Sequence, residues 1–323
     1  MKILVLHSDI PVDAPPEDQD TLIAADAVAV ALHRRGHKVT QAPFREQSLA
    51  ALLARDRPEM VFNMVEGVDG KGLLATIAPR LLAEMGMPFT GAPARPMDVT
   101  FDKPLTKRLL REAGLATPDW SVPPDWHGLD GRAWIVKAAL EDGSIGLDDG
   151  CVVPGRDVPA RAAASAIRFG GRWFAEEYVE GREFNIALLG SAGNLRILPM
   201  AEMTFADWPA GKPRIVGYGA KWHDDSDGYR QTVRRFGVER DEPGLAQKLK
   251  TSCEKVWSLF GLSGFVRVDF RVPGSGTKSA GEPLILEINV NPGIAPDAGF
   301  AAAAAEAGLA YDELIEEIVK AAL

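Results

Sequence analysis

The chain has 323 residues and a formal net charge of −9, with 46% hydrophobic and 25% charged residues. This composition excludes a disordered, collagen-like or coiled-coil chain, and the length predicts two or three packed domains. The acidic balance leaves no chain-wide basic field for phosphodiesters, so we expect neither nucleic acid nor a membrane surface as the main partner.

The cysteine pattern and the length of the apolar runs predict a cytoplasmic protein. Cys151 and Cys253 have no C-x-x-C spacing, so the sequence supports neither a disulfide framework nor a structural zinc site. No apolar run approaches the roughly 18 residues that a membrane-spanning helix needs. The run at 3–6 is far too short for the core of a signal peptide.

The N-terminal part of the chain alternates strand and helix patterns. Continuous apolar runs at 3–6 and 60–65 are typical of strands buried on both faces. Helical patterns follow them at 22–35, where Gly36 ends the helix, and at 73–85. This order predicts a parallel α/β domain whose loops, after the strand ends, can contact a ligand.

The pattern changes near residue 98, where a middle region begins. Asp102 as N-cap and Pro104 in the first turn predict a helix. Strands are predicted at 134–138 and 173–179. The remainder alternates strands with loops and ends in a helix at 311–323.

One long segment, 205–230, is polar and aromatic without clear periodicity. A long irregular stretch inside a compact domain is typical of a functional flap.

Two alternating segments, 266–272 and 284–290, carry the clearest chemical pattern. Gly- and Pro-rich sequence joins them and predicts a hairpin. Without a bulge, the register pairs Asp269 with Glu287 and Arg267 with Asn289. The alternative hypothesis gives this face no metal-binding or catalytic role and interprets it as a solvated strand face with an ordinary ion pair.

Two carboxylates directly opposite each other destabilise a sheet, so this face needs a cation. Arg271 or a bound divalent metal could supply it. Carboxylate and amide oxygens, here from Asp269, Glu287 and Asn289, suit Mg²⁺. The Gly- and Pro-fixed loop 291–296 follows and is suited to presenting backbone N–H groups to an oxyanion.

Two lysines occupy unusual positions. Lys103 falls in the first turn of the predicted helix, where the macrodipole disfavours a cation unless an anion is held there. Lys137 ends an apolar strand just before the Gly- and Ser-containing segment 142–146. Each alone could be a solvated surface charge, but together with a metal face they predict a triphosphate site.

The segment 174–183 predicts an edge strand carrying several acids. Such a strand can offer backbone groups to an adenine and a carboxylate to ribose hydroxyls, although an amphipathic edge strand with solubilising acids has the same pattern.

Residues 70–75 fit the loose dinucleotide fingerprint G-x-G-x-x-A, which would indicate an oxidoreductase. The fingerprint belongs at the first strand of a βαβ unit, however, and the first strand here is followed by no glycine-rich turn. We favour binding of a substrate anion at this helix N-terminus, with Glu66 directed at an ammonium group.

Taken in order, these segments resemble the ATP-grasp superfamily, and specifically the D-alanine–D-alanine ligase family. The matching segments are 61–67, 88–91, 102–103, 135–137, 143–146, 176–183, 220–221, 267–269 and 287–293. The resemblance implies three domains: an N-terminal α/β domain over 1–97 and two ATP-grasp domains of α+β type over 98–180 and 181–323.

The resemblance also implies nucleotide-binding roles. Lys103, Lys137 and Lys221 would contact phosphates, and Ser144 would lie in a glycine-rich flap. Glu176, Glu177 and Val179 would serve the adenine hinge, and Glu183 would bind the ribose.

The remaining implied roles concern metal and substrate. Asp269, Glu287 and Asn289 would bind two Mg²⁺ ions, with Mn²⁺ as an alternative. Arg267 and the backbone of Gly293 would stabilise an oxyanion, with Lys221 and Ser144 also in the catalytic set, and Glu66 and Gly67 would contact the substrate.

The implied activity is ATP-dependent joining of a carboxylate to an amine through an acyl phosphate. Small amino acids or amines would be the substrates, and the likeness suggests a homodimer. A nucleotide-binding regulatory protein without turnover is the alternative.

Three positions depart from the family, which has histidine, tyrosine and serine where this chain has Glu66, Trp222 and Ala298. A different acceptor is therefore predicted. Glu17, Asp18 and Asp20 are equal candidates for orienting the first amino group.

Overall fold

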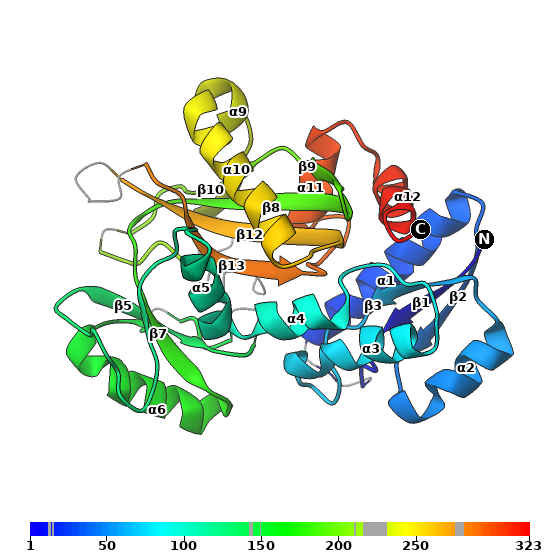
Figure 1. The fold of residues 1–323 in the computed structure, drawn as a ribbon, viewed down its shortest axis with the longest axis horizontal. Coiled ribbons are helices and arrows are strands. Elements are labelled where there is room, and N and C mark those ends of the chain that lie inside the picture. Colours follow the sequence, from blue (N-terminus) through cyan, green and yellow to red (C-terminus); the bar gives the residue numbers. More distant parts are fainter. Residues whose placement is uncertain are drawn as a thin grey trace.

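Three β-sheets organise the computed structural model, which is mixed α/β as predicted (Figure 1). The structure describes residues 1–11, 14, 16–141, 145–148, 150–209, 211–215, 231–274 and 281–323, of which 16–18 are described by backbone alone.

The N-terminal sheet is parallel, in the order β2 (Lys38–Pro43), β1 (Lys2–His7), β3 (Met60–Met64). Side chains alternate across it. Ile3 and Val5 pack toward α1 (Pro16–Arg34), whereas Leu4 and Leu6 pack toward α2 (Leu49–Asp56) and α3 (Ile77–Glu84). Burial on both faces explains the continuous apolar run and confirms the two predicted strands. The polar edge strand β2 lacked that signal.

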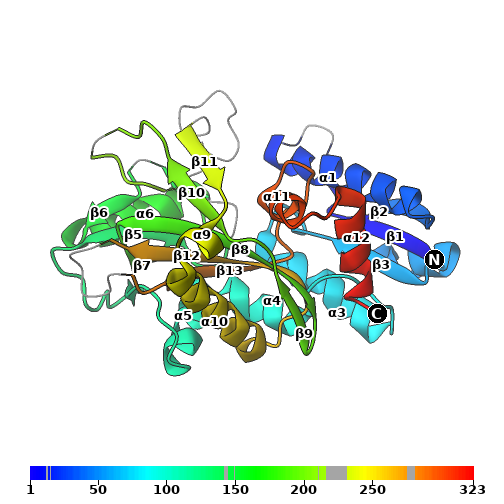
Figure 2. The same ribbon diagram turned by 90° about the horizontal axis from the view of Figure 1, so that it is seen from above.

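The last two helices return to this N-terminal sheet. α11 (Gly299–Glu306) and α12 (Tyr311–Lys320) share one core with α1, β1 and β3. Figure 2 shows α12 beside α1, and Nε2 of His37, in the loop after α1, lies 2.8 Å from Oε2 of Glu316 on α12. The helix predicted at 311–323 is present, while the domain boundaries stay a prediction.

The central sheet is antiparallel, in the order β4 (Trp120–Ser121), β7 (Trp173–Glu177), β5 (Ala133–Ala138), β6 (Val152–Pro154). The helix α6 (Val158–Phe169) covers one face through Trp134, Val136, Trp173 and Ala175. The opposite face, which carries Lys137 and Glu176, meets α5 (Lys103–Glu112). The short helix α4 (Ala94–Phe101) leads into α5 from the N-terminal domain (Figure 1).

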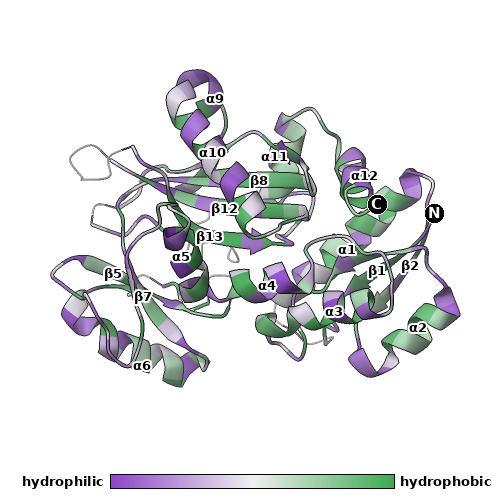
Figure 3. Ribbon diagram, viewed as in Figure 1, coloured by the Kyte–Doolittle hydropathy of each residue, from purple (hydrophilic) through white to green (hydrophobic). Residues whose placement is uncertain are grey.

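The C-terminal sheet runs β11 (Thr232–Arg235), β10 (Ala201–Phe205), β8 (Gly181–Ser191), β12 (Gly264–Pro273), β13 (Leu284–Val290), with β9 (Asn194–Ile197) paired to β8. On its covered face, apolar side chains of β8 and β12 pack against α10 (Pro243–Leu259), which follows the one-turn helix α9 (Val238–Asp241). In Figure 3, β8 and β12 are mostly hydrophobic and α9 hydrophilic.

The predicted hairpin register is confirmed. Asp269 pairs with Glu287 and Arg267 with Asn289 across β12 and β13. The assumption of a bulge-free hairpin was wrong beyond this point, because the register shifts between Asp269 and Phe270.

Two other predicted segments differ in detail. The helix predicted at 73–85 begins as a 3₁₀ helix over Gly72–Thr76 and becomes α-helical as α3. Much of the predicted flap at 205–230 lies outside the described residues, which place no helix or strand at 206–209 or 211–215. Among the described helices, none is both long and apolar enough to span a membrane.

Candidate active site

Three strands of the C-terminal sheet align polar residues in one row. Asn185 on β8, Asp269 on β12 and Glu287 on β13 are register partners. Asn185 Nδ2 donates to Asp269 Oδ1 at 2.8 Å. Sequence reasoning missed Asn185, although its place two residues after Glu183 on an alternating strand was a usable signal.

The carboxylate of Asp269 is compensated by its own strand. Arg267 binds it with two nitrogens, Nε to Oδ1 at 2.7 Å and Nη2 to Oδ2 at 2.9 Å. Asn289 Nδ2 also donates to Oδ2, at 2.9 Å. Arg271, offered above as the compensating cation, instead pairs with Glu183 at 2.9 Å. The register of the strands explains why Arg271 pairs with Glu183, because Glu183 on β8 lies directly opposite Arg271 on β12.

Lys103 brings a cation from α5 to this acidic row. The Asp102 side chain accepts the Leu105 N–H at 3.0 Å, which confirms the predicted N-cap, and Pro104 lies in the first turn. The Lys103 ammonium donates to the Glu141 carbonyl at 2.7 Å and lies 3.8 Å from Glu287 Oε2. The first-turn lysine therefore faces one of the predicted metal ligands.

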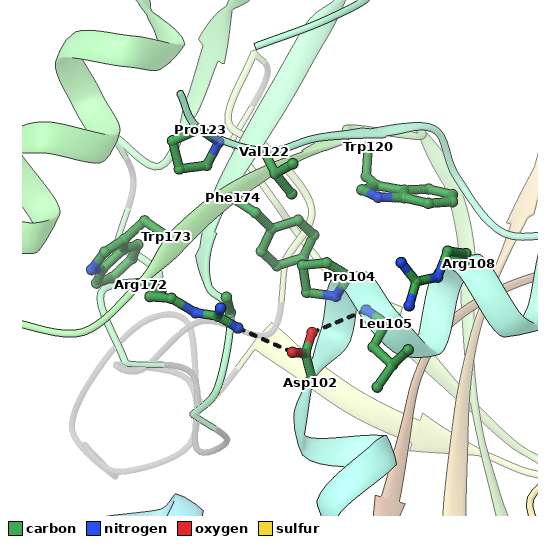
Figure 4. A pocket seen from close by; sticks show the side chains of 11 residues that line it. Asp102, Pro104, Leu105, Arg108, Trp120, Val122, Pro123, Arg172, Trp173 and Phe174 are labelled. Carbon is green, nitrogen blue, oxygen red and sulfur yellow. Dashed lines mark hydrogen bonds and ion pairs between the residues drawn. The ribbon is translucent and has the colours of Figure 1, made fainter. Parts of the chain in front are cut away.

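A cavity of about 380 Å³ lies along another side of α5 (Figure 4). Its walls include Trp120 and Phe174, and Figure 4 shows Asp102 at its edge bound to both Leu105 N and Arg172. Its lining contains none of the predicted site residues. We therefore assign it no role in the site.

Two lysines hold one buried carboxylate on the central sheet. Lys137 Nζ lies 2.6 Å from Glu176 Oε1, and Lys107 Nζ contacts Oε2. The side chains of Lys107 and Glu176 are 1% and 2% exposed. Burial opposes ionisation of Glu176, but the two ammonium groups outweigh it and hold its pKa below the ordinary value. Lys107 was missed, although it follows Lys103 by one helical turn.

The predicted nucleotide hinge spans the end of β7 and the loop after it. The prediction of an edge strand was wrong, because β7 pairs with β4 on one side and β5 on the other. Adjacent strand residues face opposite sides, so Glu177 points away from Glu176 and lies 3.0 Å from Arg132. Val179 is half-buried in the loop that leads to Gly181, the first residue of β8. Glu183 is buried two residues into β8.

The loop after β13 is fixed from the N-terminal domain. Asn291 has a left-handed backbone with φ of 52°. Its Oδ1 accepts the Ala92 N–H at 2.9 Å, and a Cβ on Gly91 would lie only 2.3 Å from that oxygen. At Gly293 a Cβ would meet nothing within 4 Å, so packing within the fold does not require a glycine there.

The segment after β3 is also held at the site. Ser8 Oγ accepts the N–H groups of Glu66 and Gly67 at 3.0 and 3.2 Å, and Thr21 Oγ1 donates to Glu66 Oε2 at 2.8 Å. A Cβ on Gly72 would lie 2.9 Å from Glu141 Oε2, so this loop adjoins the residue that binds Lys103.

Some predicted residues cannot be placed. Ser144, Lys221 and Trp222 lie outside the described residues, and the side chains of Glu17 and Asp18 are likewise undescribed. Asp20 is described, and partial burial together with Asp297 raises the pKa of its carboxyl group.

Two antiparallel sheets that present lysines and carboxylates toward one site, next to a parallel α/β domain, define the chain as an ATP-grasp protein. A family model described as the D-ala D-ala ligase C-terminus matches residues 131–320. The chain therefore belongs to the D-alanine–D-alanine ligase family, and it is an ATP-dependent ligase that forms C–N bonds.

Individual relatives agree with this family. A D-alanine–D-alanine ligase of Chromohalobacter salexigens is 31% identical over 94% of this chain and 90% of its own length. One of Moorella thermoacetica is 28% identical over 100% and 99%. A Bacillus anthracis D-alanine–D-alanine ligase solved with ATP has the same fold, with a TM-score of 0.76 and 17% identity over 100% of this chain and 97% of that one.

Proposed function

We propose that this ligase joins a substrate carboxylate to an amine other than D-alanine, through an acyl phosphate. The observation that carries the acyl-phosphate chemistry is the meeting of Lys103 with the Asp269 and Glu287 face, since cations for a triphosphate and acids for a metal then share one site. A regulatory nucleotide binder would not need this combination.

The proposed nucleotide contacts follow from the family resemblance. Lys103 and Lys137 bind phosphates, and so do Lys221 and Ser144, which lie outside the described residues. Glu176, Glu177 and Val179 serve the adenine, and Glu183 binds the ribose.

Asp269, Glu287 and Asn289 fit a Mg²⁺ site, because their hard oxygen donors lie on neighbouring strands of one sheet. Two bound ions would neutralise charge on the phosphates. Mn²⁺ accepts the same donors.

The proposed reaction has two steps. A substrate carboxylate oxygen attacks the γ-phosphorus of ATP, the bond to the β–γ bridging oxygen breaks, and ADP leaves. The amine then attacks the acyl carbon, loses a proton and displaces inorganic phosphate, which leaves an amide. Lys103 and Lys137 neutralise phosphate charge in the first step, while Arg267 and the Gly293 N–H stabilise the oxyanion in the second.

The acceptor proposal depends on side chains where the chain departs from its family. Glu66 supplies an acid that is oriented by Thr21. At Gly67 a Cβ would lie 3.1 Å from the Lys71 carbonyl oxygen, so the neighbouring backbone of the chain already adjoins that position. Ala298, at the N-cap of α11, provides no side-chain hydrogen bond for a second carboxylate. Its neighbour Asp297 would repel such a carboxylate.

A screen of amino acids and amines tests the proposal. ADP formation is measured with ATP and Mg²⁺, and the product is identified by mass spectrometry. We expect amide formation with at least one pair of small molecules and little with D-alanine alone. Efficient D-alanine dimerisation would contradict the acceptor proposal, and ADP formation that persists in Asp269→Ala and Glu287→Ala would contradict the site. The homodimer stays a prediction.

A further inference from the structure

Arg271 is a buried arginine that the proposed chemistry does not use. It lies on β12 with 4% of its surface exposed, and its Nη2 is 2.9 Å from Glu183 Oε2. Its Nη1 also donates to the Gly181 carbonyl at 3.2 Å. Both partners lie at the beginning of β8, directly after the proposed adenine hinge.

The same guanidinium reaches a segment on the other side of the site, residues 211–215, which we call the strap. Arg271 Nη2 donates to the Arg214 carbonyl at 3.0 Å. The Arg214 N–H donates to the Tyr178 hydroxyl oxygen at 2.8 Å. Both backbone groups of Arg214 are thus held by side chains, one from β12 and one from the loop after β7.

These two hydrogen bonds to Arg214 hold the next residue, Ile215, against the central sheet. Ile215 is 8% exposed and packs with Ile135 and Cys151. Ile135 precedes Lys137 by two residues on β5, so both side chains lie on the sheet face toward the proposed nucleotide. The strap therefore borders the nucleotide site from a different part of the chain.

We propose that Arg271 is a positioning residue that fixes Glu183 and the strap in one arrangement, so that the nucleotide site distinguishes ribose from deoxyribose. The inference rests on the proposed role of Glu183 at the ribose. A carboxylate has about four lone-pair positions, so one carboxylate can accept from a guanidinium and from ribose hydroxyls together. A planar guanidinium can bind a carboxylate and two carbonyls at once, which an ammonium cannot do in the same geometry.

Direct binding separates this inference from turnover. Calorimetry with the full chain and Mg²⁺ compares ADP with 2′-deoxy-ADP and 3′-deoxy-ADP. We expect the wild type to prefer ADP by roughly 10-fold over at least one deoxy analogue, as one charge-assisted hydrogen bond allows. In Arg271→Met the preference should fall to within about twofold. In Glu183→Gln the preference for ADP should fall similarly. The double variant should lose no more of this preference than either single variant.

The two buried cysteines provide an internal readout of the strap. Cys151 packs beneath Ile215, whereas Cys253 lies in the separate core of α10. Alkylation followed by mass spectrometry should show faster labelling of Cys151 alone in Arg271→Met. The Tyr178→Phe variant, which removes only the strap bond, should also expose Cys151.

The outcomes distinguish the alternatives. A folded Arg271→Met that keeps the wild-type preference for ADP overturns the inference, as does protection of Cys151 in both variants. If Arg271→Met unfolds and both cysteines react, Arg271→Lys replaces it, and wild-type preference and labelling in that variant overturn the inference equally. A wild type that binds no ADP overturns the proposed function, and this inference with it.

Discussion

The ammonium of Lys103 lies 3.8 Å from a carboxylate oxygen of Glu287, although Lys103 begins α5 and Glu287 lies on β13. A first-turn lysine opposes the helix macrodipole, and here an acid from another sheet offsets that cost. The contact joins α5 to the C-terminal sheet at the point where the proposed phosphates and metal would meet.

Removal of this cation should impair turnover more than folding. In Lys103→Met we expect kcat/KM for ATP to fall by roughly 100-fold, because a charge that neutralises the transferred phosphoryl group is lost. Steady-state ADP release measures it. Arg108→Met is the matched control, because Arg108 lies exposed on the same helix and should leave activity near wild type. Equal losses in both variants would contradict the assignment of Lys103.

The buried pair of Lys107 and Glu176 should be costly to break. We expect Lys107→Met to lower the free energy of unfolding by about 3 kcal/mol, since a buried carboxylate loses one of its two cations. Urea unfolding measures it. Lys248→Met, which removes an exposed pair with Glu282, should cost less than about 1 kcal/mol. Similar losses of unfolding free energy in the two variants would show that the buried pair stabilises the fold no more than an exposed pair does.

The pKa of Glu176 predicts an acid-sensitive fold. Because its folded-state pKa lies below the ordinary value of about 4.5, the charged form stabilises the native state above that pH. This contribution is lost as the pH falls through the lower, folded pKa. Unfolding of Glu176→Gln should therefore depend less on pH than that of the wild type below about pH 5. If the free energy of unfolding changed with pH in the same way for the two proteins, the prediction would be contradicted.

The contact between Gly91 and Asn291 should tolerate no side chain. In Gly91→Ala the new Cβ would meet Asn291 Oδ1 at 2.3 Å, in addition to the strain of a φ of 93°. We expect a loss of about 2 kcal/mol or more and a higher KM for the carboxylate substrate, because the loop that carries Gly293 must shift.

Gly86→Ala is the control for that substitution. Gly86 also has a positive φ, of 65°, but a Cβ there would meet nothing within 4 Å. Its cost should be limited to backbone strain of about 1 kcal/mol. Thermal unfolding together with substrate kinetics compares the two, and equal effects would show that the close approach to Asn291 does not matter.

Sequence reasoning succeeded where the signal was local. The continuous apolar run of β1, the capping of α5 by Asp102 and the alternation in β12 and β13 each follow from neighbours along the chain. The pairing of Asp269 with Glu287 was also predictable, because a hairpin leaves few registers that keep both polar faces together.

Other features depended on which elements meet. Three such features join segments that are distant in the sequence: the packing of α12 against α1, the pairing of Arg271 with Glu183, and the burial of Lys107 beside Glu176. The sequence determined the class of chemistry through its family resemblance. It also determined that Asp269 and Glu287 face each other, because alternation along a strand encodes which side chains share a face. Only the tertiary structure decided which charges compensate one another, since that depends on distance through space and on burial, and neither is written in the order of residues.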